Sequence, residues 1–199
     1  EIEAMLDGVH QPDTENLELL LDVVSVMERL IEDLRTLTLA ESGALSLHLE
    51  PVDVADLIQD VLDAHRRTTS AAGIEVTTQL SDRVGDVVID PVRIREVVAN
   101  LVVNSIRAMP GGGQLSATLA EDDASILIAI TDSGVGISAD DLEHVFDRFR
   151  KGSTSSGSGL GLTITRDLVE AHNGSIEIES EVGRGTTVMV RLPRVSEPE

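Results

Sequence analysis

A long run of regularly spaced apolar residues marks the first quarter of the chain. From Thr14 to about Ala40 these residues recur at alternating spacings of three and four, which predicts one long helix with an apolar seam. The seam residues, with those that widen it, are Leu17, Leu20, Leu21, Val24, Met27, Leu30, Ile31, Leu34 and Leu37. Such a helix either packs on its own domain or joins an intermolecular bundle, and we favour the bundle.

After this helix the pattern changes to short segments that predict strands and further helices. Leu45, Leu47 and Leu49 alternate with polar residues, which predicts a short strand in a hinge at 44–50. Further strands are predicted at Ile74–Leu80, Val87–Ile89, Gln114–Ala120 and Ser125–Thr131, with two closing strands near the C-terminus. Helices are predicted from Asp53 through Leu62, from Asp90 to about Met109, near Ala139–Phe149 and at Leu160–His172. This mixture predicts an α+β fold in which helices cover one sheet.

Composition and charge narrow the classes of function. The 199 residues include 15 Lys and Arg against 36 Asp and Glu, a formal net charge of −21 that argues against unassisted binding to nucleic acid or anionic lipid. The absence of cysteine excludes thiol catalysis and disulfides. No stretch reaches the roughly 18 consecutive apolar residues of a membrane span, so we expect no membrane contact in this segment. The two aromatic residues, Phe146 and Phe149, leave no stacking platform for bases.

Candidate chemistry lies on the helix that opens at Asp90. Glu96, Asn100, Asn104 and Arg107 share one face of this helix, opposite its apolar side. Amides at two helically spaced positions are unusual on a solvated face, where Lys and Glu are common. The face is either a surface with incidental amides or a set of oxygen ligands for a hard cation such as Mg²⁺, with Arg107 for phosphate.

Two glycine-rich segments follow this helix. Asp132 to Ile137 comes directly after an apolar strand and is also typical of a simple turn at a strand end. Gly157 to Leu162 opens a helix, where successive glycines permit close backbone approach and the helix N-terminus attracts an anion. Neither segment fits a P-loop, which ends in Gly-Lys-Ser/Thr, or a dinucleotide turn within an N-terminal βαβ unit.

Five short motifs occur in a fixed order along the second half of the chain. They are Asn100–Asn104, Asp132–Gly136, Val145–Phe149, Gly157–Gly161 and Gly183–Thr186. This series resembles the N, G1, F, G2 and terminal Gly-Thr boxes of sensor histidine kinases. That family shares its ATP-binding Bergerat fold with gyrase, mismatch-repair and chaperone ATPases, so the resemblance implies a two-layer sandwich whose mixed sheet is covered by helices on one face. The residues from 29 to 43 resemble the second helix of the kinase dimerisation bundle.

The resemblance implies three parts of the chain. Residues 1–43 would form a partial dimerisation and phosphoacceptor region with its second helix at about 14–40, residues 44–50 the hinge, and residues 51–195 the ATP-binding catalytic domain. The acceptor motif, a His followed by an acidic residue, an apolar residue, Arg and Thr-Pro, is absent, because His10 precedes Gln11-Pro12-Asp13. We therefore expect the chain to begin after the acceptor helix and to bind Mg-ATP without phosphorylating itself.

The same resemblance implies roles for individual residues. Asn104, together with Asn100, would hold the Mg²⁺ that bridges the ATP phosphates, and Arg107 would replace the family's usual phosphate-contacting lysine. Asp132 would accept a hydrogen bond from the exocyclic amine of adenine, where guanine offers a carbonyl. The remaining expected ATP contacts are Gly134, Gly136, Ile137, Phe149, Arg150, Lys151, Gly157, Gly159, Leu160, Gly161, Leu162 and Thr186.

Glu96 and Arg107 are the expected catalytic residues. Glu96 lies one turn before Asn100, where related ATPases place a carboxylate that activates water, and in kinases it would orient the acceptor imidazole or serve phosphatase chemistry. A lid is expected at about 147–158, anchored by the two phenylalanines. The family's aromatic residue after this helix is replaced by Ala108-Met109-Pro110, which predicts weaker base stacking. The histidines expected in surface or packing roles are His48, His65, His144 and His172.

The sequence therefore predicts the ATP-binding kinase domain of a two-component sensor histidine kinase. It would transfer the γ-phosphoryl group of ATP to a histidine outside this chain and thence to an aspartate of a response regulator. A homodimer through the N-terminal helix is expected, in the cytoplasmic part of a membrane-bound sensor. The alternatives are a Bergerat-fold ATPase, a serine kinase of the anti-sigma-factor type, or a degenerate dimerisation module that binds no nucleotide.

Overall fold

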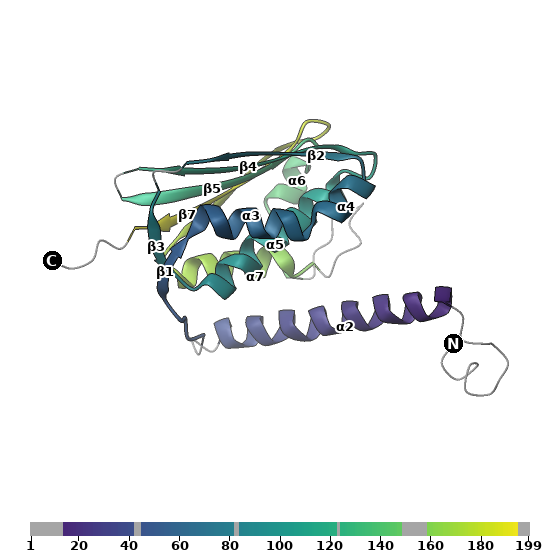
Figure 1. Ribbon diagram of the computed structural model, residues 1–199, viewed down its shortest axis with the longest axis horizontal. Coiled ribbons are helices and arrows are strands. Elements are labelled where there is room, and N and C mark those ends of the chain that lie inside the picture. Colours follow the sequence, from purple (N-terminus) through teal and green to yellow (C-terminus); the bar gives the residue numbers. More distant parts are fainter. Residues whose placement is uncertain (1–13, 42–44, 82–83, 123, 149–158, 195–199) are drawn as a thin grey trace.

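The computed structural model describes residues 14–41, 45–81, 84–122, 124–148 and 159–194, arranged in two layers beside one long helix (Figure 1). One layer is a sheet, and the other consists of helices that cover a single face of it. The long helix, α2 (Thr14–Glu41), lies on the far side of the helical layer, next to α7 (Gly161–Ala171). The predicted α+β fold is confirmed, whereas the N-terminal residues before Thr14 lie outside the described part.

The main sheet has five strands in the order β2-β4-β5-β7-β6. β2 (Ile74–Leu80) runs parallel to β4 (Gly113–Glu121), while the other neighbours are antiparallel. The central strand is β5 (Ser125–Asp132), followed by β7 (Gly185–Pro193) and the edge strand β6 (Ser175–Glu181). The sheet is therefore mixed, as the resemblance implies.

A second, small sheet joins β1 (Glu50–Asp53) to β3 (Asp86–Ile89) in antiparallel register. The strand predicted at 45–49 is wrong, because these residues have no regular structure and β1 begins only after them. Their alternation has another cause, since Leu45 and Leu47 are half-buried while the polar residues that follow each of them are exposed. The linker between α2 and β1 thus lies against the domain with one side and has no strand partner.

Helices form most of the connections between strands. α3 (Val54–Ala64) is capped by Asp53, as predicted, and α4 (Arg66–Ala71) follows after one residue. The pattern did not predict α4, because its six residues carry no apolar periodicity. α5 (Pro91–Ala108) starts after the Asp90 cap and an N1 proline, close to the predicted bounds, and α7 also agrees with its prediction.

The helix predicted near Ala139–Phe149 is wrong in its length. α6 spans Ala139–Leu142 and begins at Ser138, whose side chain accepts a backbone N–H of the first turn. Turns follow this helix. The backbone carbonyl of Phe146 accepts a hydrogen bond of 2.8 Å from the hydroxyl group of Thr163 on α7. The chain leaves the helical path here because it is drawn against α7 instead of continuing its own hydrogen bonds.

The core lies between the helical layer and the sheet and is built from Val, Ile and Leu side chains. The apolar side of α5 has exposures of 0–1% at Ile94, Val97, Val98, Leu101 and Val102. Side chains alternate across a strand, so one face of each central strand meets this helix. The fully buried residues there include Leu115, Ala117, Ile126 and Ile128. The polar face of α5 is consequently turned away from the sheet.

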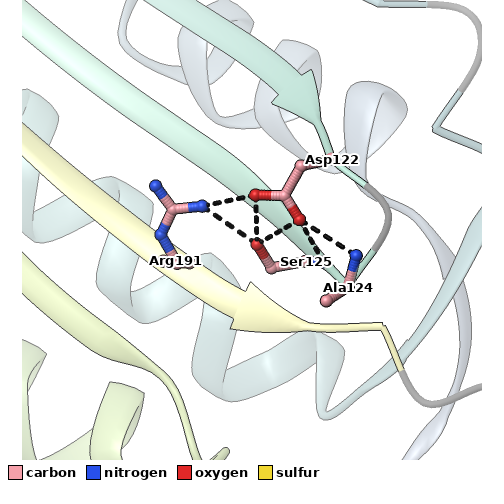
Figure 2. Close-up of polar contacts among 4 residues, drawn as sticks. All are labelled: Asp122, Ala124, Ser125 and Arg191. Atoms are coloured by element: carbon pink, nitrogen blue, oxygen red, sulfur yellow. Dashed lines mark hydrogen bonds and ion pairs between the residues drawn. The ribbon is translucent and has the colours of Figure 1, made fainter.

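A carboxylate closes the turn between β4 and β5 (Figure 2). Asp122 accepts the backbone N–H groups of Ala124 and Ser125, at 3.0 and 2.8 Å, and also the hydroxyl of Ser125. Arg191 on β7 donates to the same carboxylate at 2.7 Å, which ties the turn to a neighbouring strand. These donors, with the Ala124 N–H foremost, hold the pKa of Asp122 below its usual range.

Candidate functional site

The two asparagines of α5 meet the first residue of α7. A Cβ atom on Gly161 would lie 3.9 Å from Oδ1 of Asn100 and 3.9 Å from Nδ2 of Asn104. Because glycine has no Cβ, the backbone of the first turn of α7 faces both amides directly, and the first N–H groups of a helix have no partner within it. The structure thus brings Asn100, Asn104 and Gly161 together, although Gly161 lies far from both asparagines in sequence.

Asn100 has a polar atom without a partner. Its side-chain nitrogen is buried and makes no hydrogen bond within the protein. Buried polar groups are nearly always hydrogen-bonded, and leaving one unsatisfied costs about 1–3 kcal/mol. An unpaired amide beside a helix N-terminus is the arrangement expected where a bound ligand completes the hydrogen bonds.

Asp132 ends β5 with a buried carboxylate. Only 6% of the residue is exposed. Its Oδ1 accepts the N–H of Gly134 at 2.9 Å, and the carboxylate also accepts the Ser105 hydroxyl of α5 and the Thr186 N–H of β7. Burial raises the pKa of Asp132, and the three hydrogen bonds offset this only in part. A buried carboxylate with a raised pKa is typical of a functional group.

Glycines let the loop after β5 pass close to neighbouring backbone. A Cβ on Gly134 would lie 2.5 Å from the carbonyl oxygen of Ala108, at the end of α5. Gly136 has a φ of +70°, and a Cβ there would lie 2.1 Å from the carbonyl oxygen of Glu181. Between the two glycines, the N–H of Val135 donates to the Ala108 oxygen at 3.0 Å. The loop is therefore pinned between α5 and the end of β6.

Hydroxyl groups connect this loop to the strands beneath it. The N–H of Ile137 donates to the Ser180 oxygen at 2.8 Å, and the Ser180 and Thr186 hydroxyls share a hydrogen bond of 2.9 Å. Thr186 lies opposite Asp132 in the register of β5 and β7. Ser180 was not predicted as a site residue, although it is a polar residue on the inward, otherwise apolar side of β6.

Glu96 is half-buried and ion-paired. Its carboxylate accepts Nη1 of Arg93 at 3.1 Å, with side-chain exposures of 22% for Glu96 and 20% for Arg93. Arg93 was not predicted as a site residue, although its spacing of three residues from Glu96 on a helix favours such a pair. Arg107 lies in the last turn of α5 and is exposed, so the two predicted catalytic residues flank the asparagines on either side.

The remaining predicted contact residues divide into two groups. Leu160 is 1% exposed and belongs to the hydrophobic core, so its backbone alone is available to a ligand. Gly159 has a φ of +74°, and Leu162 packs against the core while half-buried. The predicted contacts that lie outside the described residues are Phe149, Arg150, Lys151 and Gly157.

The near end of the predicted lid is held on α7. The guanidinium carbon of Arg166 lies 5.3 Å from the ring centroid of Phe146, within the range of a cation–π contact. The Phe146 carbonyl is bound by Thr163 of the same helix. Phe146 therefore anchors the start of this segment, while the residues beyond Arg148 are not part of the described structure.

Protein side chains alone offer no metal centre in the part of the chain that the structure describes. No group of three or more His, Asp or Glu residues is placed there to hold a metal ion. A cation at Asn100 and Asn104 would therefore need oxygen ligands from a bound molecule. A hollow of about 300 Å³ lies elsewhere, between α3, α4 and β2, and none of the predicted site residues lines it.

Residues 89–196, which include the asparagines, Asp132 and the start of α7, match the family model described as histidine kinase-, DNA gyrase B-, and HSP90-like ATPase. The chain belongs to this ATPase family. Membership makes ATP the expected ligand of a site that holds two amides of α5 facing a helix N-terminus and a buried carboxylate bound to α5 through Ser105.

Curated relatives of this ATPase-family chain are sensor kinases. The chain is 33% identical over 198 residues to the signal transduction histidine-protein kinase BaeS of Escherichia coli K12, covering 97% of the chain and 42% of BaeS. It is 32% identical over 201 residues to the sensor protein SrrB of Staphylococcus aureus, covering 96% of the chain and 34% of SrrB. The chain thus spans less than half the length of these relatives.

Solved structures agree with the family. The histidine kinase AdeS of Acinetobacter baumannii has a TM-score of 0.83 at 27% identity, covering 98% of this chain and 92% of that one. The mycobacterial sensor histidine kinase MprB has a TM-score of 0.64 at 30% identity, covering 73% and 97%. The resemblance drawn from the five motifs is confirmed. No helix in the described ranges is long and apolar enough to cross a membrane.

Proposed function

We propose that the chain is the ATP-binding kinase domain of a two-component sensor histidine kinase. In this function the γ-phosphoryl group of ATP passes to a histidine outside the chain and thence to an aspartate of a response regulator. The observation that carries the proposal is the unpaired Nδ2 of Asn100, buried beside Asn104 at the start of α7. A phosphate oxygen would supply the missing hydrogen-bond acceptor.

Asp132 is proposed to select adenine. The exocyclic amine of adenine donates hydrogen bonds and would find the buried carboxylate as an acceptor, whereas guanine presents a carbonyl oxygen at that position. Two acceptors facing each other would leave the carboxylate unsatisfied, and such a mismatch discriminates strongly. The close approach of the loop at Gly134 and Gly136, and the hydroxyl contact between Ser180 and Thr186, support a base site around this carboxylate.

The asparagines fit Mg²⁺ bound to the phosphates of ATP. Magnesium prefers oxygen ligands and is usually held by a few protein oxygens together with phosphate oxygens. We propose that Asn104, with Asn100, holds the ion, which neutralises phosphate charge when bound. Arg107 and the backbone N–H groups of residues 159–162 would contact the phosphates directly.

The long helix supports a dimeric kinase. Its seam is open to solvent, with exposures of 66% at Leu21, 56% at Met27 and 64% at Ile31. Among the α2 side chains that the structure describes, only Thr36 and Leu37 are buried. An apolar stripe of this length needs a partner helix. We therefore take residues 1–43 as part of the dimerisation region, 44–50 as the hinge and 51–195 as the catalytic domain. A homodimer, a response regulator as partner and a place in the cytoplasmic part of a membrane-bound sensor belong to the same proposal.

A calorimetric titration with Mg-ADP and a non-hydrolysable ATP analogue tests the proposal. Saturable binding is expected, with no binding of GTP, and Asp132→Ala should abolish it. Asp86→Ala, which removes an exposed carboxylate on β3, is the matched control and should bind as the unaltered protein does. Absence of adenine-nucleotide binding in the unaltered protein would refute the proposed function and favour a degenerate dimerisation module.

ATP hydrolysis is a second candidate, favoured by one observation. Glu96 is a half-buried carboxylate one turn before Asn100, held by Arg93, and a carboxylate at this point could activate water. Steady release of phosphate from ATP by the chain alone, lost in Glu96→Gln, would identify a hydrolase. Binding without release is the result expected of the kinase, because its acceptor histidine lies outside the chain.

A further inference from the structure

The linker after α2 is tied to the start of α5 by a side chain. The paired strands β1 and β3 end at Glu50 opposite Ile89. Just beyond this pair, the backbone N–H of His48 donates to Oδ2 of Asp90 at 2.9 Å. The Asp90 carboxylate thus takes the place of the next backbone acceptor and extends the small sheet into the linker.

The same carboxylate caps α5 with its other oxygen. Oδ1 of Asp90 accepts the N–H groups of Val92 and Arg93, at 3.0 and 3.1 Å. The residue is only 4% exposed. The two carboxylate oxygens therefore accept different hydrogen bonds. Oδ2 binds the linker, and Oδ1 binds the helix that carries Asn100 and Asn104.

The backbone of Asp90 reaches the end of α7. Its N–H donates to Nε2 of His172 at 3.1 Å, and Nδ1 of His172 lies 2.7 Å from the carbonyl oxygen of Leu168. A backbone N–H only donates and a carbonyl only accepts, so the ring is neutral and carries its proton on Nδ1. His172 is 6% exposed and, as the sequence predicts, has a packing role.

We infer that Asp90 and His172 are positioning residues that set the placement of α2 relative to the nucleotide site. They join three segments at one point: the linker that follows α2, the start of α5 and the end of α7, whose other end faces the asparagines. Most of the described α2 surface is exposed, so the linker bond to Asp90 acts together with the packing of α2 on α7, where Thr36 and Leu37 are buried, to place the helix. We call the hydrogen bonds of Asp90 and His172 to these three segments the clamp. Its geometry is independent of the proposed function, whereas the identity of the site as a nucleotide site rests on that function.

Asp90→Asn is expected to remove the hydrogen bond to the linker while keeping the cap of α5. Asparagine caps helices as well as aspartate does, so its single oxygen is expected to stay with α5, where it serves two N–H groups. Its NH₂ group then faces the N–H of His48, and two donors cannot bond. Asp53→Asn is the matched control, because Asp53 caps α3 in the same way and makes no bond to the linker.

Two measurements read the outcome. Amide exchange by NMR should show the His48 N–H exchanging about tenfold to hundredfold faster in Asp90→Asn, the range expected for loss of a hydrogen bond to a charged group. Spin labels on Val23→Cys and Thr77→Cys, both exposed, report the distance between α2 and β2 in a chain that has no cysteine of its own. The distance distribution should broaden or shift in Asp90→Asn and stay unchanged in Asp53→Asn.

An unchanged distance distribution in Asp90→Asn, despite faster exchange at His48, would overturn the inference. If Asp90→Asn does not fold, His48→Pro removes the same donor from the linker side, and the same change in distance is expected with Ser46→Pro as its control. Titration with Mg-ADP accompanies each variant and should agree with the unaltered protein within about twofold. Loss of nucleotide binding in every sample, the unaltered protein included, would refute the proposed function. The spin-label distances would still test whether Asp90 and His172 position α2.

Discussion

The buried carboxyl group of Asp132, the proposed adenine acceptor, makes the stability of the protein depend on pH. Burial raises its pKa above the ordinary value of 3.8, so the folded protein binds more protons than the unfolded chain between the two pKa values. The contribution of Asp132 to stability therefore falls as pH rises through that window and stays low above it. At neutral pH the ionised carboxylate thus lowers the free energy of unfolding, and the proposed benefit of its charge is hydrogen bonding to adenine.

A first prediction concerns Asp132→Asn, which removes this titration. As pH is lowered from 7 toward 4, the difference in unfolding free energy should shift in favour of the unaltered protein, because it alone takes up the extra proton. Mg-ADP should bind about tenfold more weakly or worse, since a neutral acceptor forms weaker bonds. Urea unfolding at several pH values and calorimetry measure both effects. A free-energy difference that does not vary with pH would contradict the prediction, and Asp86→Asn is the control.

The glycines around Asp132 can be separated by the space that they occupy. Gly136→Ala should lower the unfolding free energy by more than about 3 kcal/mol, because it adds a clash with the Glu181 carbonyl to a left-handed backbone. Gly183 has a φ of +80° and nothing within 4 Å of a Cβ, so Gly183→Ala should cost only about 1–2 kcal/mol. Chemical denaturation compares the two variants. Equal losses would show that the backbone near Glu181 yields easily.

Among the elements, α5 packs against the core with one face and carries the asparagines of the site on the other. Its N-cap depends on charge: burial of Asp90 favours the neutral form, but N–H groups from His48, Arg93 and Val92 outweigh it and hold the pKa of Asp90 below its ordinary 3.8. A depressed pKa gives stability that is complete above about 3.8 and is lost as pH falls through the folded value.

Asp90→Ala is therefore expected to act in a pH-dependent way. At neutral pH it should lower the unfolding free energy by about 1–2 kcal/mol, the usual cost of losing a helix cap. The deficit should shrink as pH falls below 3.8 and through the lowered pKa of the folded carboxyl, because the unaltered protein then loses its charge as well. Denaturant unfolding at pH 7 and near pH 3 measures the change. A deficit that persists undiminished in acid would mean that the cap contributes through shape rather than charge.

Most elements could be predicted from the sequence because their own residues specify them. α5 has a cap, an N1 proline and an apolar stripe, and the core strands read as apolar runs between turns. The predictions were wrong where tertiary contacts, and not the local sequence, determine the secondary structure. The residues at 45–49 alternate because one side lies on the domain, and α6 stops early because Phe146 is held by α7.

The candidate site was predictable in its residues and not in its arrangement. Spacing placed Asn100 and Asn104 on one face, but their meeting with Gly161 depends on how α5 packs on α7. Ser105 carries no signal in the sequence and is revealed only by its contact with Asp132, whereas Ser180 interrupts the apolar inward side of β6 and its contact with Ile137 shows why.

For the whole molecule, the exposed seam of α2 and the negative charge act against each other. If the seam is a dimer interface, Ile31→Glu should weaken self-association strongly, while Thr77→Glu, an exposed position on β2 away from α2, should not. Added salt should tighten association of the unaltered protein, because two chains of charge −21 repel each other less when screened. Sedimentation analysis measures both, and Mg-ADP binding should be the same in all samples. Equal association of the two variants would place the interface elsewhere.

The parallel pairing of β2 with β4 also fixes an order of assembly. β4 and β5 are neighbours along the chain, as are β6 and β7, so these hairpins close over short turns. Among the described strands, β2 has no hairpin partner: its one neighbour in the sheet, β4, follows only after β3 and all of α5, and closing this loop costs more entropy than closing a hairpin turn. Pulsed hydrogen exchange during refolding should therefore find β2 protected last, and native exchange should find it opening first. We therefore expect folding to finish, and unfolding to begin, at the edge of the sheet beside the hollow between α3, α4 and β2.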